Sequence, residues 1–135
     1  MPEDIRQPVI RYIQEVMNEH KLEVLDELFA PDFINEATGF PPIIGVQAMR
    51  EGLQSILDGF PDCQVTIEDM MAIDDKVIAR WSMSGTHTGV FQNIPPTGKK
   101  ITVSGIAIDI IRQQKIARRW AYNSFPILVQ QLGPE

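Results

Sequence analysis

The sequence predicts an α+β fold, in which N-terminal helices pack on the concave face of a curved antiparallel sheet to form a cone-shaped α+β barrel. Apolar residues recur at helical spacing between residues 8 and 58, whereas polar and apolar residues alternate between residues 64 and 124. The helical part and the strand part are separate along the chain, which favours α+β over an alternating α/β arrangement. A strongly curved sheet beneath helices leaves one open end, where an apolar pocket is expected.

Three helices and one short strand are expected in the first half of the chain. The first helix begins near Gln7, because the ring of Pro8 is tolerated only in a first helical turn. Pro31 ends the second helix, and two prolines make residues 38–42 a loop. The expected ranges are residues 8–19, around 22–29 and about 46–58 for the helices, and 33–37 for the strand.

Four long strands are expected in the second half, joined as an antiparallel meander. Tight turns at residues 74–76 and 113–115 separate strands, whereas residues 85–100 carry the glycines and prolines of a long connection. Strands that follow one another through such turns pair antiparallel, because a parallel pair needs a crossover. The expected strands are residues 64–68, 77–84, 101–111 and 116–124.

Length, charge and hydropathy restrict the classes of function. The 135 residues are expected to form one domain, 1–135, with a core of its own. The net charge of -6 argues against a nucleic-acid partner, because phosphate contacts need a basic face. No apolar run reaches the ~18 residues of a membrane span, and the acidic N-terminus lacks an apolar secretory segment. We therefore expect a cytoplasmic protein with no membrane partner.

The usual catalytic and metal-binding motifs are not found in the sequence. Cys63 is the single cysteine, which excludes an intramolecular disulfide and a cysteine zinc cluster. The two histidines, His20 and His87, are too few for a multi-histidine metal site, and serine–histidine–aspartate catalysis would depend on His87. We expect no metal and no cofactor. Acid–base chemistry on a small apolar substrate is the candidate chemistry that these absences leave.

Short motifs along nearly the whole chain resemble those of one family. They occur in the family's order and spacing at residues 30–33, 60–62, 85–89, 95–99, 115–116, Trp120 and 131–133. By these motifs the chain resembles the SnoaL-like polyketide cyclases. The resemblance implies an α+β cone similar to nuclear transport factor 2 and the ketosteroid isomerases. Such cones are usually dimeric, so a homodimer is expected.

The resemblance also implies a reaction. Characterised members close a polyketide ring by an intramolecular aldol reaction, which needs an apolar pocket and a group that moves protons near the carbonyl. In the family this group looks like an aspartate shortly after the tryptophan of the last strand. Here the corresponding positions hold Ala121 and Ser124, which cannot serve at neutral pH. Three neighbouring positions also differ from the family pattern, and they hold Glu36, Ala107 and Arg118.

Two residues are candidates for the missing catalytic proton carrier. Glu36 lies on the short strand that such folds place near the pocket mouth, where apolar surroundings would favour its protonated form. Its alternative is an exposed position at a strand end. His87 either contacts a substrate oxygen and transfers a proton, or makes a structural bond to the backbone of its own connection.

Further residues are candidates for the ligand pocket. Asp109 belongs to it if the face of Ala107 lines the pocket, and otherwise lies at the surface or a dimer edge. Arg80 either holds an anionic group of a ligand or crosses a dimer interface to a carboxylate. Trp81 and Trp120 either stack on a ligand or belong to the core or an interface.

The last strand leaves one choice open. Strict alternation places Arg119, Ala121 and Asn123 on one face, and Trp120, Tyr122 and Ser124 on the other. Only one of these faces lines the pocket, and the sequence does not say which. If it is the face of Ala121, Asn123 is the polar group of the pocket and donates a hydrogen bond to a carbonyl.

Three functions fit these observations. The first is a cyclase or isomerase homologue that acts on a small hydrophobic carbonyl compound by cofactor-free acid–base chemistry. The second is a non-catalytic protein that binds a small hydrophobic molecule, which the missing aspartate favours. The third is a structural or assembly role through an exposed face of the sheet.

Overall fold

The computed structural model describes residues 4–37, 41–124, 128 and 132. The helices within these residues are α1 (Gln7–Arg11), η1 (Tyr12–Asn18), η2 (Leu22–Val24), α2 (Leu25–Leu28) and α3 (Val46–Gly59). The strands are β1 (Phe29–Ala37), β2 (Ile43–Ile44), β3 (Gln64–Ile73), β4 (Lys76–Thr86), β5 (Lys100–Arg112) and β6 (Lys115–Asn123).

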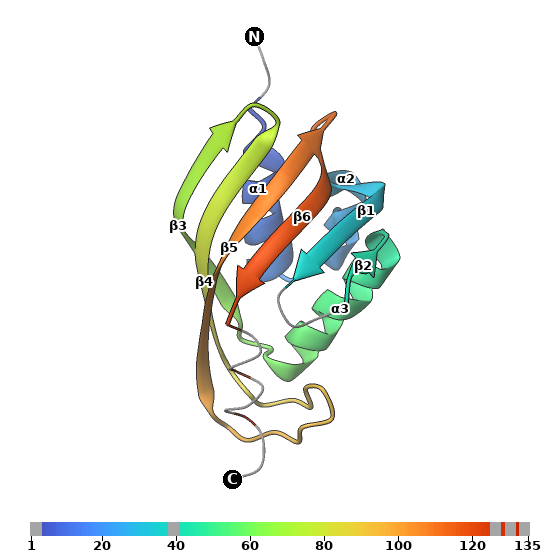
Figure 1. Cartoon of the computed structure of the whole chain (residues 1–135). Helices are drawn as coiled ribbons and strands as arrows, with labels where there is room; N and C mark the ends of the chain where they lie inside the picture. Colours follow the sequence, from blue (N-terminus) through green and yellow to red (C-terminus); the bar gives the residue numbers. More distant parts are fainter. Residues whose placement is uncertain (1–3, 38–40, 125–127, 129–131, 133–135) are drawn as a thin grey trace.

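The strands form one curved sheet in the order β2-β1-β6-β5-β4-β3. The four long strands β3 to β6 make the expected antiparallel meander. Figure 1 shows α1 and α3 on the concave side of this sheet, while β2 and β3 are its two unjoined edges. The predicted α+β class is confirmed, and the sheet curves without closing into a complete barrel.

One strand pair departs from the expected antiparallel sheet. β1 runs parallel to β6, and Asn35 of β1 lies beside Arg119 of β6. A parallel pair needs a long crossover, and here α3 and the strands β3 to β5 lie between the two partners in the sequence. The pairing brings residues 35 and 119, which are far apart in the sequence, to neighbouring positions on the concave face.

The first helix differs from expectation in its hydrogen bonding. It is α-helical only to Arg11 and continues as the π-helix η1, which ends one residue before the expected boundary. At this end the N–H of Glu19 donates to the carbonyl of Gln14 over 3.0 Å, a step of five residues. Apolar spacing alone did not reveal this change from the four-residue to the five-residue hydrogen-bond pattern. Tyr12 and Met17, which are five positions apart, both line the cavity described below.

β1 begins four residues earlier than expected. Pro31 lies inside this strand rather than directly after the helix, because α2 already ends at Leu28. The register between β1 and β6 is interrupted between Phe29 and Ile34, and such an irregularity tolerates a proline without an N–H. Residues 38–40 of the expected loop, and residues 131 and 133 of the C-terminal motif, lie outside the described residues.

The long connection after β4 folds onto the end of α3. The N–H groups of Thr88 and Gly89 both donate to the carbonyl oxygen of Gly59 over 3.2 Å, which satisfies a carbonyl that the helix end leaves unpaired. A Cβ added at Gly89 would lie 1.8 Å from the carbonyl oxygen of Asp58, so only glycine permits this approach. The connection is therefore fixed to the helix rather than extended into solvent.

The hydrophobic core lies between the concave face and the helices. Its largest fully buried side chains include Phe29, Phe33, Phe60, Leu25 and Leu28. Phe29 contacts the rings of Tyr12 and Phe33 edge to face, with centroids 5.2 and 4.6 Å apart. No helix in the described part of the chain is long and apolar enough to cross a membrane.

Candidate functional site

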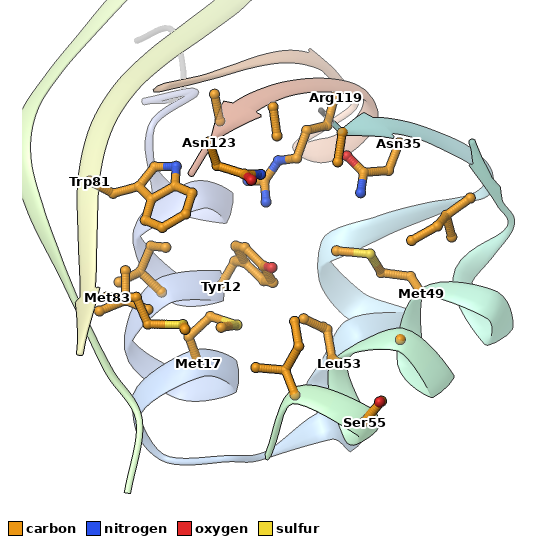
Figure 2. Close-up of a pocket in the computed structure, with 18 of the residues that line it drawn as sticks. Tyr12, Met17, Asn35, Met49, Leu53, Ser55, Trp81, Met83, Arg119 and Asn123 are labelled. Atoms are coloured by element: carbon orange, nitrogen blue, oxygen red, sulfur yellow. The ribbon is translucent and has the colours of Figure 1, made fainter. Parts of the chain in front are cut away.

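A cavity of about 460 Å³ lies between the concave face of the sheet and the helices η1 and α3 (Figure 2). Most of the described side chains around it are aliphatic or thioether groups, among them Ile13, Met17, Met49, Leu53, Ile67 and Met83. The polar or partly polar lining residues are Tyr12, Asn35, Ser55, Trp81, Gln92, Arg119 and Asn123. The cavity therefore combines a large apolar wall with a few polar groups.

A buried ion pair stands at the sheet end of this cavity. Arg119 donates from Nε and Nη2 to the two carboxylate oxygens of Asp109, over 2.6 and 2.9 Å. Asp109 is fully buried, and Arg119 is 7% exposed. Burial opposes the charge of Arg119, but the charge of Asp109 outweighs it and raises the pKa of the guanidinium above its ordinary value. The cation is therefore fixed in place, with Nη1 outside the ion pair.

Asn35 stands next to this cation. It lies beside Arg119 in the parallel pair of β1 and β6, and it is buried, with 7% of the residue exposed. Its Oδ1 is buried without a hydrogen-bond partner in the described part of the chain. Figure 2 shows the Asn35 amide and the Arg119 guanidinium facing the same end of the cavity. We expect a buried amide with an unpaired atom to form a hydrogen bond with a molecule bound in the cavity.

Tyr12 completes the polar end from the helical side. Its ring lies beneath the guanidinium of Arg119, with Cζ 4.6 Å from the ring centroid. The side chain is 4% exposed, and burial raises the pKa of its hydroxyl, while the positive charge of Arg119 opposes that rise. The phenol therefore stays protonated at neutral pH.

The open choice on the last strand is settled by the lining residues. Arg119, Ala121 and Asn123 line the cavity. Trp120 points to the opposite face, where the guanidinium of Arg118 lies 4.9 Å from its ring centroid. Trp120 is therefore not part of this cavity, contrary to its place among the candidate pocket residues.

Trp81 lines the cavity from β4. Its partner in the sheet is Gly105, and a Cβ there would lie 2.9 Å from a carbon of the indole ring. The glycine thus leaves room for the indole between β4 and β6. Asp109, by contrast, does not itself line the cavity but holds Arg119 from behind.

Glu36 and Arg80 lie on the outer face of the sheet, away from the cavity. Glu36 follows Asn35 in β1 and therefore points to the other side, where Arg118 Nη2 donates to its Oε2 over 2.8 Å. Its side chain is 41% exposed, so the expected apolar surroundings are not found. Arg80 is exposed beside a shallow outer groove that includes Glu68 and Ser82.

His87 is fully buried but does not line the cavity. The N–H of Thr97 donates to its Nδ1 over 3.3 Å, and the Thr97 hydroxyl oxygen lies 2.9 Å from the same nitrogen. Because Nδ1 accepts, the proton of the neutral ring lies on Nε2, which is buried without a partner among the described residues. In this position His87 holds together the two sides of its own connection.

Sequence reasoning did not name Tyr12, Asn35 and Arg119 as site residues. The alternation of the last strand had placed Arg119 on the face of Asn123, and this was a usable signal. Nothing in the sequence indicated that β1 would lie parallel to β6 and bring Asn35 to Arg119. Within the described residues, no group of three histidine, cysteine, aspartate or glutamate side chains is arranged to hold a metal ion.

The family model of the SnoaL-like polyketide cyclases matches residues 7–132. The chain belongs to this family. The match covers the cavity, both of its polar strands and the connection that carries His87. No curated protein matches the chain.

Solved structures have the same fold. A candidate SnoaL-like polyketide cyclase from Jannaschia sp. CCS1 superposes with a TM-score of 0.87 at 16% identity, over 100% of this chain and 99% of that one. IdmH, a candidate polyketide cyclase from Streptomyces antibioticus, gives 0.82 at 25% identity, over 98% and 100%. AclR, a candidate hydroxylase from Streptomyces galilaeus, gives 0.83 at 21% identity, over 96% and 80%. The chemistry named for AclR differs from that of the other two, so the shared fold does not by itself define a reaction.

Proposed function

We propose that this SnoaL-like protein binds a small hydrophobic carbonyl compound in the cavity and promotes cyclisation or isomerisation by cofactor-free acid–base chemistry. The observation that carries the proposal is the guanidinium of Arg119, which is fixed by Asp109 at the end of an otherwise apolar cavity. Ring closure by an aldol step moves negative charge onto a carbonyl oxygen. A fixed cation aimed at that oxygen stabilises the charge as it develops.

Asn35 supports the same orientation of the substrate. Its amide lies beside the guanidinium, and we assign a donation to the substrate oxygen both to the amide Nδ2–H and to the guanidinium, while Oδ1 is the atom of Asn35 without a partner among the described residues. The aliphatic and thioether wall between η1 and α3 would hold the carbon skeleton and fold it against the reacting carbonyl. The ion pair is neutral as a whole but has its positive end toward the cavity, which suits a neutral substrate that becomes charged during the reaction.

A non-catalytic binding protein is the second candidate function. It is favoured by a specific observation: no carboxylate and no imidazole lines the cavity among the described residues. Ketone enolisation ordinarily needs a positioned base, and a protein without one would hold its ligand unchanged.

Binding can be tested with 2-tetralone, a bicyclic ketone, and with its hydrocarbon analogue tetralin. Replacing Trp120 by Phe leaves Trp81 as the only tryptophan, so fluorescence then reports on the cavity wall. We expect saturable binding of both compounds. Asn35→Leu should weaken binding of the ketone by about tenfold, because it removes a hydrogen-bond donor, and should leave tetralin binding unchanged. Equal effects on both ligands would show that Asn35 does not contact the carbonyl.

Turnover can be tested with 2,6-heptanedione, whose intramolecular aldol reaction closes a six-membered ring. Product formation followed by NMR should be faster with the protein than in buffer. It should return to the buffer rate in the paired variant Asp109→Asn/Arg119→Gln, which removes the fixed cation without leaving one buried charge. Binding of 2-tetralone without any acceleration of ring closure supports the binding protein instead.

A further inference from the structure

The cavity contains two ionisable side chains among its described lining residues, Tyr12 and Arg119. Arg119 is paired through Nε and Nη2 with Asp109, and this pairing keeps its positive charge. A guanidinium held in this way stabilises charge but does not release a proton at neutral pH. Among the ionisable lining side chains in the described part of the chain, Tyr12 is thus the one with a proton to transfer.

The position of Tyr12 suits such a transfer. Its ring contacts the guanidinium of Arg119, with Cζ 4.6 Å from the ring centroid, and the ring of Phe29 edge to face, with centroids 5.2 Å apart. Figure 2 places it below Arg119, between the sheet and the side chains of Met49 and Leu53 on α3. A phenol this rigid loses no freedom when a substrate oxygen approaches it.

The surroundings of Tyr12 act in opposite directions on its hydroxyl. Burial is the main cause that raises the pKa of Tyr12, and the carboxylate of Asp109 adds to the rise, whereas Arg119, which lies against the ring, lowers it. The thiol of Cys63, which is buried and protonated at neutral pH, makes a smaller contribution that also raises the pKa of Tyr12. A phenolate formed for a moment at Tyr12 would therefore be stabilised by the adjacent cation.

Tyr12 also occupies a distinctive place in the backbone. It is the first residue of the π-helix η1, where the ladder changes from the four-residue step of α1. π-helical turns occur mostly as local insertions within α-helices, and such insertions are frequent at functional sites. This observation is independent of the cavity and points to the same residue.

We propose that Tyr12 is a catalytic residue that gives a proton to the carbonyl oxygen of an apolar ketone and later takes one back. The proposal rests on the proposed function, because it needs a ketone in the cavity. No carboxylate lines the cavity among the described residues, so the proton transfer falls to a phenol beside a fixed guanidinium.

The step balances as follows for enolisation. A water molecule removes a hydrogen from the carbon next to the carbonyl as Tyr12 donates its O–H proton to the carbonyl oxygen. The C–H electron pair becomes the C=C bond, the former C=O pair holds the new O–H, and Tyr12 keeps the electron pair of its own O–H bond as phenolate. Water leaves this step as hydronium. When the enol carbon forms its next bond, either to the hydronium proton or to a second carbonyl carbon whose oxygen takes that proton, the enol O–H proton returns to Tyr12.

The experiment measures exchange of the α-hydrogens of 2-tetralone for deuterium in D2O by NMR. The variant is Tyr12→Phe, which keeps the ring on Arg119 and removes the hydroxyl. Tyr122→Phe is the matched control, because Tyr122 is exposed on the outer face of the sheet. We expect the wild-type protein and the control to accelerate exchange equally. Tyr12→Phe should lower the accelerated rate by about 100-fold, well beyond the roughly tenfold loss of ketone affinity that one missing hydrogen-bond donor causes.

Three results are distinguishable. If the wild-type protein does not bind 2-tetralone, the proposed function fails and this inference fails with it. If the protein binds the ketone and Tyr12→Phe exchanges it as fast as the wild type, Tyr12 is not the proton donor although the proposed function stands. If the protein binds the ketone without accelerating exchange, the assignment of Tyr12 is overturned in favour of a binding protein.

Discussion

The pair of Arg119 and Asp109 shows how single residues decide what the cavity does. Asp109 was a candidate for direct contact with a ligand, and instead it fixes a cation that lines the cavity. A buried carboxylate paired in this way affects the stability of the fold as well as the geometry of the site. Its replacement therefore tests whether the ion pair also holds the fold together.

Asp109→Asn should lower the free energy of unfolding by about 3–5 kcal/mol, because it leaves Arg119 buried without a compensating charge. Urea unfolding at neutral pH measures this loss. The matched control is Glu36→Gln. It breaks the ion pair of Glu36 with Arg118 on the outer face, which has a similar N–O distance of 2.8 Å but two partly exposed side chains. The control should cost about 0–1 kcal/mol. Equal costs would contradict the assignment of the Arg119 pair as buried.

Cys63 provides a prediction about pH. Burial raises the pKa of its thiol to about 11, and the charge of Asp62 adds to the rise. The folded state therefore favours the protonated thiol. Its contribution to stability is complete below the ordinary thiol value near 9 and is lost as the pH rises toward about 11. A thiol reagent at pH 8 should react with the unfolded chain and not with the native one, and rapid reaction without urea would contradict the burial of Cys63.

At the scale of elements, the connection between β4 and β5 depends on one close approach. Gly89→Ala should destabilise the protein by several kcal/mol, because the new Cβ would overlap the carbonyl oxygen of Asp58. Hydrogen exchange should speed up at Thr88 and at residue 89, whose N–H groups donate to Gly59. Gly98→Ala is the control, since no atom lies within 4 Å of its added Cβ, although its positive φ adds some strain. Unchanged exchange at Thr88 would contradict the attachment.

The elements also show where sequence reasoning succeeds and where it stops. Alternation predicted the meander because half-buried strands have a period of two residues that the chain itself displays. It did not predict the pairing of Asp109 with Arg119. Counting back from the turn of the β5–β6 hairpin gives Arg118 as the partner of Asp109, but Ala117 is an extra residue that shifts the register by one. A local bulge of this kind has no strong signal in the sequence.

The same limit applies to Glu36 and His87. Their residue types suggested proton transfer, yet the side of the sheet and the fold of the connection decided where they lie. Both depend on contacts between residues that are distant in the sequence. Those contacts follow from packing and cannot be read from periodicity.

At the scale of the whole molecule, we expect the outer face of the sheet to be the interface of the predicted homodimer. Exposed apolar side chains gather there on β3, β5 and β6, and they are Met71, Ile73, Ile106 and Tyr122. A patch of this kind on a small protein marks an interaction surface. We expect a second copy of the chain to cover it.

Light scattering after gel filtration should therefore give twice the chain mass of 15.3 kDa. Ile106→Glu should reduce it to the monomer mass, because a charge would be buried in an apolar interface. Val90→Glu is the control, since Val90 is also exposed, at 59% against 46% for Ile106, but lies on the connection after β4. A monomeric wild-type protein at tens of micromolar would contradict the homodimer.

The π-helix η1 has a consequence for how the cavity can be altered. Its wide ladder accommodates one more residue per turn than the α-helix that precedes it. Deleting Gln14 would let this segment rewind as an α-helix and would leave Tyr12 and Met17 four positions apart, which is the spacing of one α-helical face. Both side chains would then still share one wall. In this protein a single codon lost within η1 is thus absorbed by the helix, whereas the same loss in the middle of α3 would rotate one part of its lining by about 100° relative to the other.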